Sequence, residues 1–271
     1  MSNERDYVLG THDAEVERLG LQHRVWTPHT TEAWRRAGFT RGQTLLDLGC
    51  GPGYATLDLA RIVGPDGRVI AVDRSRRFLS VLESAARDRG LANIEPHELD
   101  LDDQPLPDAA LDGVWSRWVY AFVREPRRLL ERVAAQLRPG GVLVLFEYVD
   151  YGAWRLSLSR PAFERFVAKV VESWRESGGE PDVGLDLPRW LHELGFELAG
   201  VRAITEFARP GDAFWAWCEA FVDVGPERLV DIGKVDAAAA KEIRAAFAET
   251  EATPGAFLMT PTVLALIARK P

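Results

Sequence analysis

The sequence predicts an α/β fold in which parallel strands alternate with crossover helices. Through the middle of the 271-residue chain, short apolar runs alternate with segments of helical periodicity. Joints that contain glycine and proline, such as VGPDGR and LRPGG, precede two of the apolar runs. We expect strands at 43–48, 67–73, 93–99, 111–116 and 140–148, and helices at 54–63, 75–90 and 125–138.

The segments on either side of this core are predicted to be mainly helical. Residues 1–40 carry apolar side chains at helical spacing, as in EVERLGLQHRVW and TEAWRRAGF, and are expected to form a helical lid. Residues 41–271 are expected to form one domain with helical cap insertions at about 150–185 and 210–255. Two further strands are expected, near 196–207 and in the terminal run TVLALIARK.

The composition excludes several classes of partner. A formal net charge of −8 argues against nucleic acid and against an anionic membrane surface. The two cysteines, Cys50 and Cys218, lack the spacing of a zinc site or a disulfide framework, so no metal is expected. Because no apolar run is long enough to span a bilayer and the start MSNERDYVLG is polar, we expect a cytoplasmic protein. The sequence leaves a homodimer open.

The run LLDLGCGPGY ends the first expected strand and begins a helix. Glycines at 49, 51 and 53 allow a sharp turn and let backbone N–H groups approach a ligand at the start of the helix. A dinucleotide-binding loop has its third glycine at the position where this chain has Tyr54. Asp47 would repel a diphosphate but suits a ligand that carries an ammonium or sulfonium charge. The loop therefore favours S-adenosylmethionine over a nicotinamide dinucleotide.

Asp73 ends the second expected strand. An acid at this place accepts hydrogen bonds from ribose hydroxyls, and it does so for either ligand, so it does not separate them. An N-cap for the following helix is the alternative role, although Ser75 could also cap that helix.

The motif DLGCGPG, followed by Asp73 and the segment HELDLDDQPLPDAALDGVWS, resembles class I S-adenosylmethionine-dependent methyltransferases. The resemblance covers about residues 40–150 and, more loosely, the last two strands. It is closest to the small-molecule branch that includes ubiquinone and menaquinone methyltransferases. It implies a Rossmann-like, seven-stranded, mostly parallel sheet with an antiparallel last strand and helices on both faces. The implied reaction is methyl transfer to the O, N or C of a small organic acceptor by in-line displacement.

The resemblance also implies which residues bind the cofactor. Asp100 and Leu101 would edge the adenine, and the chain after the fourth strand would run beside the methionine portion. The first helix would close over the ligand. The predicted cofactor-binding residues are Asp47, Gly49, Cys50, Gly51, Gly53, Asp73, Arg74, Asp100, Leu101, Ser116, Arg117, Arg18 and Gln22.

The acceptor pocket is the part that the resemblance leaves open. Its predicted lining residues come from the N-terminal helices and from the loops after the fourth and fifth strands; they are Tyr7, Trp26, Trp118, Tyr148, Tyr151 and Trp154. A hydroxyl acceptor can require a base, and the catalytic candidates are Glu147, Tyr120 and His12. Several of the nine tryptophans fall in cap segments, which suggests an aromatic-lined cavity for a flat or greasy acceptor, although ordinary core packing explains them equally well.

Two other functions stay open at this point. The first is a nicotinamide-dependent oxidoreductase, against which Asp47 and Tyr54 both argue. The second is a protein that binds S-adenosylmethionine without transferring its methyl group, which the sequence barely distinguishes from an enzyme.

Overall fold

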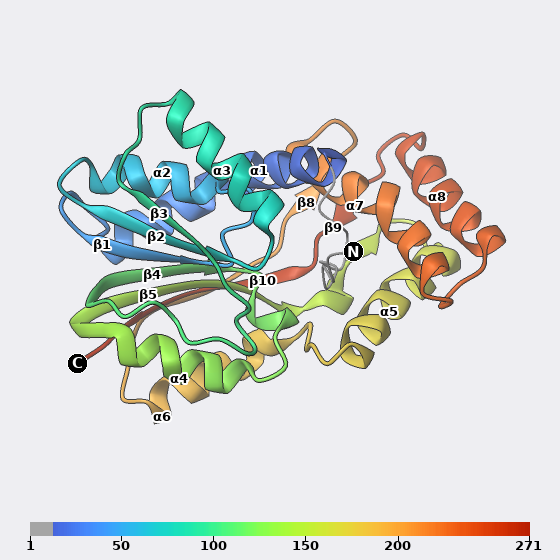
Figure 1. The fold of residues 1–271 in the computed structure, drawn as a ribbon. Helices are drawn as coiled ribbons and strands as arrows, with labels where there is room; N and C mark the ends of the chain where they lie inside the picture. Colours follow the sequence, from blue (N-terminus) through green and yellow to red (C-terminus); the bar gives the residue numbers. More distant parts are fainter. Residues whose placement is uncertain (1–12) are drawn as a thin grey trace.

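A seven-stranded sheet forms the centre of the computed structural model, which describes residues 13–271 (Figure 1). Its order is β3-β2-β1-β4-β5-β10-β7. The strands are β1 (Thr44–Leu48), β2 (Arg68–Asp73), β3 (Ile94–Glu98), β4 (Leu111–Arg117), β5 (Leu137–Asp150), β7 (Glu197–Ile204) and β10 (Thr262–Arg269). Strands β1 to β5 pair in parallel, and β10 pairs antiparallel with both of its neighbours, β5 and β7. The predicted sheet is confirmed.

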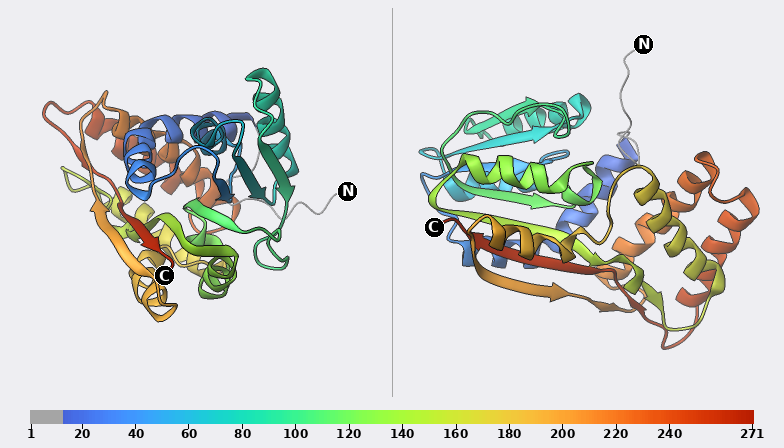
Figure 2. Two further views of the ribbon diagram at one scale, coloured as in Figure 1. Left: turned by 90° about the vertical axis from the view of Figure 1, so that its left-hand side faces the viewer. Right: turned by 90° about the horizontal axis from the view of Figure 1, so that it is seen from below.

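Helices cover both faces of this sheet, which explains why β1, β4 and most of β5 bury nearly every residue. On one face lie α1 (Asp13–Ala37), α2 (Tyr54–Val63) and α3 (Arg76–Asp88), and on the other lie α4 (Pro126–Gln136) and α6 (Leu187–Glu193) (Figures 1 and 2). The predicted helices 54–63, 75–90 and 125–138 correspond to α2, α3 and α4 within two residues at each end.

Three more helices form a separate layer beyond one end of the sheet, which we call the helical cap (Figures 1 and 2). They are α5 (Pro161–Glu176), α7 (Ala213–Asp231) and α8 (Ala237–Glu251). Short 3₁₀ turns η1 (Tyr120–Phe122), η2 (Tyr151–Ala153) and η3 (Val183–Leu185) join the sheet to its surroundings. The three cap helices fall within the two segments where insertions were expected.

From residue 13 onward, the N-terminal segment forms one continuous helix, α1, with Pro28 inside it, where more than one helix was expected. Proline removes one backbone N–H and normally breaks or kinks a helix. Here the Thr27 hydroxyl donates to the carbonyl of His23 at 2.7 Å in the turn before the proline. Trp26 and Trp34, both buried, anchor the two halves of the helix against the core. Tertiary packing therefore carries α1 through the proline.

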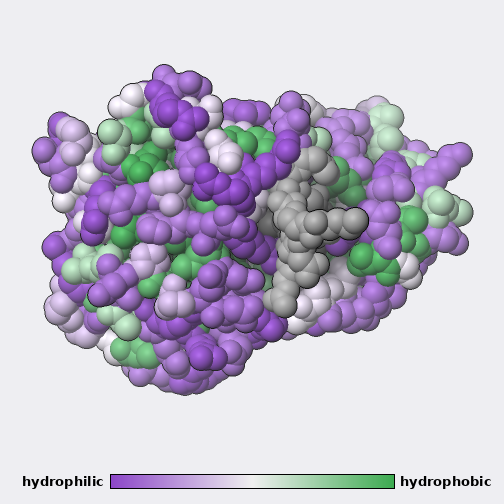
Figure 3. All heavy atoms as spheres, in the orientation of Figure 1, coloured by the Kyte–Doolittle hydropathy of each residue, from purple (hydrophilic) through white to green (hydrophobic). Residues whose placement is uncertain are grey.

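A second, three-stranded sheet was not predicted. It consists of β6 (Arg155–Leu156), β9 (Leu258–Met259) and β8 (Phe207–Ala208), and two residues are too few to show any periodicity. The surface seen in Figure 3 is largely hydrophilic, with apolar side chains in small scattered groups. Within residues 13–271, no helix is both long and apolar enough to cross a membrane.

Candidate active site

The glycine loop between β1 and α2 takes a shape that two of its glycines make possible. Gly49 has φ +68°, and a Cβ there would lie 2.4 Å from Cγ2 of Val119. Gly53 has φ +83°, and a Cβ there would lie 2.3 Å from Cδ1 of Leu82 on α3. Both conformations disfavour residues with a side chain, and both contacts exclude one. The loop is thereby held tightly against the turn after β4 on one side and against α3 on the other.

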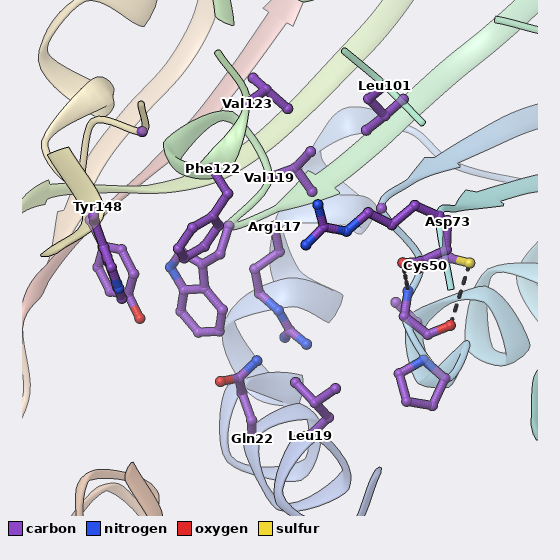
Figure 4. A pocket seen from close by; sticks show the side chains of 18 of the residues that line it. Leu19, Gln22, Cys50, Asp73, Leu101, Arg117, Val119, Phe122, Val123 and Tyr148 are labelled. Atoms are coloured by element: carbon purple, nitrogen blue, oxygen red, sulfur yellow. Dashed lines mark hydrogen bonds between the residues drawn. The ribbon is translucent and has the colours of Figure 1, made fainter. Parts of the chain in front are cut away.

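Asp73 is tied to this loop from the end of β2. Its carboxylate accepts a hydrogen bond from the backbone N–H of Gly51 at 2.8 Å (Figure 4). It accepts another from the backbone N–H of Ser75, also at 2.8 Å. The N-cap role belongs to Ser75, whose hydroxyl accepts from the N–H of Phe78 at 3.2 Å. Burial raises the pKa of the Asp73 carboxyl, and the two backbone N–H groups oppose that rise. Asp73 is therefore positioned to face a ligand.

Asp47 is buried at the end of β1 and accepts a hydrogen bond from the Thr56 hydroxyl at 2.6 Å. Burial raises its pKa to about 7, while the Thr56 hydrogen bond and the positive charge of Arg117 pull the pKa down. A cation that binds beside this carboxyl favours its ionised form. The protonation state of Asp47 is consequently coupled to the charge of whatever the cavity holds.

A cavity of about 510 Å³ joins these groups. We call the part around the glycine loop, Asp73 and Asp100 the cofactor end. Predicted cofactor residues line it except for Gly53, which packs on α3, and Ser116, which is buried within β4. Those that line it are Arg18, Gln22, Asp47, Gly49, Cys50, Gly51, Asp73, Arg74, Asp100, Leu101 and Arg117. Figure 4 shows Arg117 extending into the cavity toward Leu19 and Gln22 of α1.

The other part of the cavity, the acceptor end, is lined mainly by aromatic rings. Of the predicted residues, Trp118, Tyr148, Tyr151 and Trp154 line it. Trp26 does not, because it packs edge-on behind Trp118 with ring centroids 5.3 Å apart. Trp174 and Trp217 also line this end, and they are among the cap tryptophans that suggested an aromatic-lined cavity. Sequence reasoning did not assign Phe122, Cys218 and Phe221, which line it as well. Tyr7 and His12 lie outside the described residues.

Five of these rings form a continuous surface that we call the aromatic wall: Trp217, Trp118, Tyr148, Tyr151 and Trp174. Trp118 stacks on Trp217 at 5.7 Å and on Tyr148 at 5.2 Å, with interplanar angles of 11° and 14°. Tyr151 meets Tyr148 edge-on at 4.9 Å and Trp174 at 4.8 Å. The Trp217 indole N–H donates to Oε1 of Gln22 at 3.2 Å, so the wall is also bonded to α1.

Glu147 and Tyr120, which were predicted to be catalytic, do not line the cavity. Glu147 is completely buried, and its carboxylate accepts from the backbone N–H groups of Val119 at 2.8 Å, Tyr120 at 2.9 Å and Ala121 at 3.4 Å. Burial raises its pKa to about 7 against the effect of those N–H groups. Tyr120 is also completely buried, and burial raises the pKa of its phenol. Both side chains are therefore buried outside the cavity lining.

Cys50 lines the cofactor end, but burial raises the pKa of its thiol well above the ordinary value, so it is no nucleophile near neutral pH. Within residues 13–271, no group of three or more His, Cys, Asp or Glu side chains could hold a metal ion.

Comparisons with known proteins agree with this geometry. Residues 46–145 match the family described as a methyltransferase domain. Over 192 residues the chain is 32% identical to the ubiquinone/menaquinone biosynthesis C-methyltransferase UbiE of Vibrio campbellii. The match covers 66% of this chain and 72% of that protein. The chain belongs to the class I S-adenosylmethionine-dependent methyltransferases.

Two solved structures share the fold. Geranyl diphosphate C-methyltransferase from Streptomyces coelicolor A3(2), in complex with Mg²⁺, geranyl diphosphate and S-adenosyl-L-homocysteine, has a TM-score of 0.58 at 16% identity, over 92% of this chain and 80% of that chain. The [4+2]-cyclase SpnF has a TM-score of 0.56 at 23% identity, over 90% of this chain and 80% of that chain. The chain spans 48% and 61% of the length of two other curated relatives. Because one fold serves different reactions, the substrate must be argued from the cavity.

The cofactor of this family is S-adenosylmethionine, and the residues of the cofactor end fit it. A Cβ on Gly51 would meet no atom closer than 4.0 Å, so the loop backbone lies open toward the cavity at that residue. The carboxylate of Asp73 can accept from ribose hydroxyls, and Asp47 suits a positively charged amino group. The side chain of Tyr54 crosses to α1, where its hydroxyl donates to the carbonyl of Val16 at 3.1 Å. The family and this geometry do not support a nicotinamide cofactor.

Proposed function

We propose that the protein transfers a methyl group from S-adenosylmethionine to a small, flat, largely apolar acceptor. The observation that carries the proposal is that one cavity connects the glycine loop and Asp73 to the aromatic wall. A ligand bound at the cofactor end is therefore in open connection with a ligand that lies against Trp118 and Tyr148. Rings of this kind bind flat apolar molecules by stacking and edge contacts.

When bound, the cofactor supplies a methyl group on a positively charged sulfur. The residues of the chain hold the two ligands in line and exclude water, which can supply most of the rate in a displacement that neutralises charge. Asp47, Asp73 and Asp100 bind the cofactor, and the aromatic wall orients the acceptor. Burial raises the pKa of the Tyr151 phenol and of the Cys218 thiol well above their ordinary values, so both stay protonated near neutral pH and can donate hydrogen bonds to an acceptor.

Binding of the cofactor is tested by thermal shift with S-adenosylmethionine, S-adenosylhomocysteine and NAD. A ligand at a hundred times its dissociation constant stabilises a protein by about 2.7 kcal/mol, which is easily measured. We expect the first two ligands to raise the melting temperature and NAD to leave it unchanged. Stabilisation by NAD alone would contradict the proposal.

Methyl transfer is tested separately, by incubation with a labelled methyl donor and a metabolite extract and by mass spectrometry for the gain of one methyl group. A labelled product identifies the acceptor and shows whether O, N or C is methylated. Persistent absence of any product, with the cofactor bound, would favour a protein that binds S-adenosylmethionine without transferring its methyl group.

We infer from the net charge of −8 that the acceptor is not a nucleic acid. A homodimer and a cytoplasmic location stay predictions, and light scattering on the purified protein checks the first.

A further inference from the structure

The turn between β4 and η1 contains a backbone conformation that needs support. Trp118 has φ +53°, and no other residue with a side chain in the described range 13–271 has a positive φ. A bulky residue adopts this left-handed region only where its surroundings hold it there. The ring of this strained residue is the middle member of the stack Trp217, Trp118 and Tyr148.

Two sets of hydrogen bonds hold the turn. On one side, the N–H of Trp118 donates to the carbonyl of Phe146 at 2.9 Å, which continues the ladder between β4 and β5. On the other side, the Glu147 carboxylate accepts the next three backbone N–H groups, those of Val119, Tyr120 and Ala121. Strand β5 therefore holds the turn immediately before and immediately after the strained residue.

We propose that Glu147 is a positioning residue for the acceptor end, which fixes the orientation of the aromatic wall by holding Trp118 in its left-handed conformation. The inference rests on the proposed function only in treating this surface as the acceptor end. Without the carboxylate, three buried N–H groups lose their partner, and the turn can satisfy them only by changing its backbone. Trp118 then relaxes out of the left-handed region, and its indole leaves the gap between Trp217 and Tyr148.

The variants Glu147→Gln and Glu147→Ala test the proposal. Glutamine keeps one carbonyl oxygen for the two shorter hydrogen bonds, so Glu147→Gln is the milder change and guards against a variant that fails to fold. Asp112→Asn is the matched control, because Asp112 is a buried carboxylate at the other end of β4. Its carboxylate accepts from the N–H of Thr44 at 2.7 Å, and it pairs with Arg138, far from the aromatic wall.

The measurement is circular dichroism of the coupled indoles, read on protein without ligand. The difference between the spectra of the wild type and Trp217→Phe gives the contribution of Trp217 and its stacked partners. The same difference is taken in each Glu147 or Asp112 variant, with and without Trp217→Phe. Trp217 also packs edge-on against Trp26 at 5.3 Å. We therefore expect Glu147→Ala to remove the part of that contribution that depends on Trp118, Glu147→Gln to reduce it less and Asp112→Asn to leave it intact. Retention of the full contribution in both Glu147 variants overturns the proposal, as does an equal loss in Asp112→Asn, which would indicate general loosening. No methyl transfer is involved in the readout, so a failure of the proposed function is detected by the turnover assay alone.

Discussion

The two ends of the cavity are built in different ways. At the cofactor end, most lining residues follow the carboxyl ends of neighbouring strands β1, β2, β3 and β4, and the site depends on backbone conformation at Gly49 and Gly53. At the acceptor end, the rings come from the turn after β4, from β5, from η2 and from cap helices α5 and α7, which are far apart in the sequence. The cofactor end depends on backbone conformations that require glycine, and the acceptor end depends on how large side chains pack.

The two ends also meet at defined contacts. Gln22 of α1 lines the cavity and accepts the hydrogen bond from Trp217. Val119, which follows Trp118, packs closely against Gly49 of the glycine loop. Substitutions at these places show how far the two ends are independent.

The largest effect is expected for Gly49→Ala. A residue with a side chain at φ +68° costs about 1–2 kcal/mol, and a Cβ only 2.4 Å from Val119 adds an overpacking cost of about 1–3 kcal/mol. We expect a loss of unfolding free energy in urea and loss of S-adenosylhomocysteine binding in calorimetry.

Gly38→Ala is the matched control for Gly49→Ala. Gly38 has φ +81°, but a Cβ there meets nothing within 4 Å. The Gly38→Ala variant should be destabilised only by the conformational cost of about 1–2 kcal/mol and should keep its affinity for the ligand. Equal losses in the two variants would show that the contact with Val119 does not matter.

Asp73→Ala should weaken S-adenosylhomocysteine binding by about 10- to 100-fold, since hydrogen bonds to a charged acceptor are worth about 1.5–3 kcal/mol. Ser75→Ala provides the control, because it removes the N-cap of α3 and leaves the Asp73 carboxylate in place. That change should cost about 1 kcal/mol of stability and leave the affinity within about twofold. An unchanged titration of Asp73→Ala would remove Asp73 from the site.

The affinity for S-adenosylhomocysteine should rise about tenfold between about pH 6 and pH 8. The free Asp47 carboxyl has a pKa of about 7, and the amino group of the ligand favours the ionised carboxylate, so binding strengthens as the group loses its proton. Calorimetry at the two pH values checks this, and Asp47→Asn should abolish the dependence. A pH dependence that persists in Asp47→Asn would assign it to another group.

The same pKa shift has the opposite sign for the stability of the free protein. Burial raises the pKa of Asp47 from 3.8 to about 7, so between these values the folded state binds more protons than the unfolded state. The contribution of this carboxyl to the free energy of unfolding is complete below the pKa of the unfolded state. It is lost as the pH rises through the folded-state pKa of about 7. Urea denaturation of the wild type and Asp47→Asn across this range measures it.

The smallest effect is expected for Trp217→Phe, which removes the hydrogen bond to Gln22 and keeps an aromatic ring in the aromatic wall. A buried hydrogen bond of this kind is worth about 0.5–1.5 kcal/mol. S-adenosylhomocysteine affinity should stay within about twofold if the two ends are independent. Trp190→Phe serves as the control for loss of an indole, because Trp190 belongs to α6, on the face of the sheet opposite α1. A large loss of affinity in Trp217→Phe alone would show that α1 couples the ends.

The positions of the central strands and of the glycine loop could be predicted from the sequence because both follow from local rules. Buried parallel strands are short apolar runs, and the sharp turn at residues 49–53 requires glycine. The aromatic wall could not be assembled in the same way. Trp217 comes beside Trp118, and Trp174 beside Tyr148, only through the packing of α7 and α5. The surroundings of Glu147 could not be predicted for a related reason. A carboxylate at the end of a strand predicts a polar site, but only the fold shows that its partners are buried backbone N–H groups.

A crystal structure of the protein with S-adenosylhomocysteine tests the central claim most directly. The account predicts a ligand over the glycine loop, with its ribose hydroxyls on the Asp73 carboxylate and its sulfur toward the aromatic wall. A ligand bound elsewhere, or one in this cavity that leaves Asp73 without a contact, would contradict it.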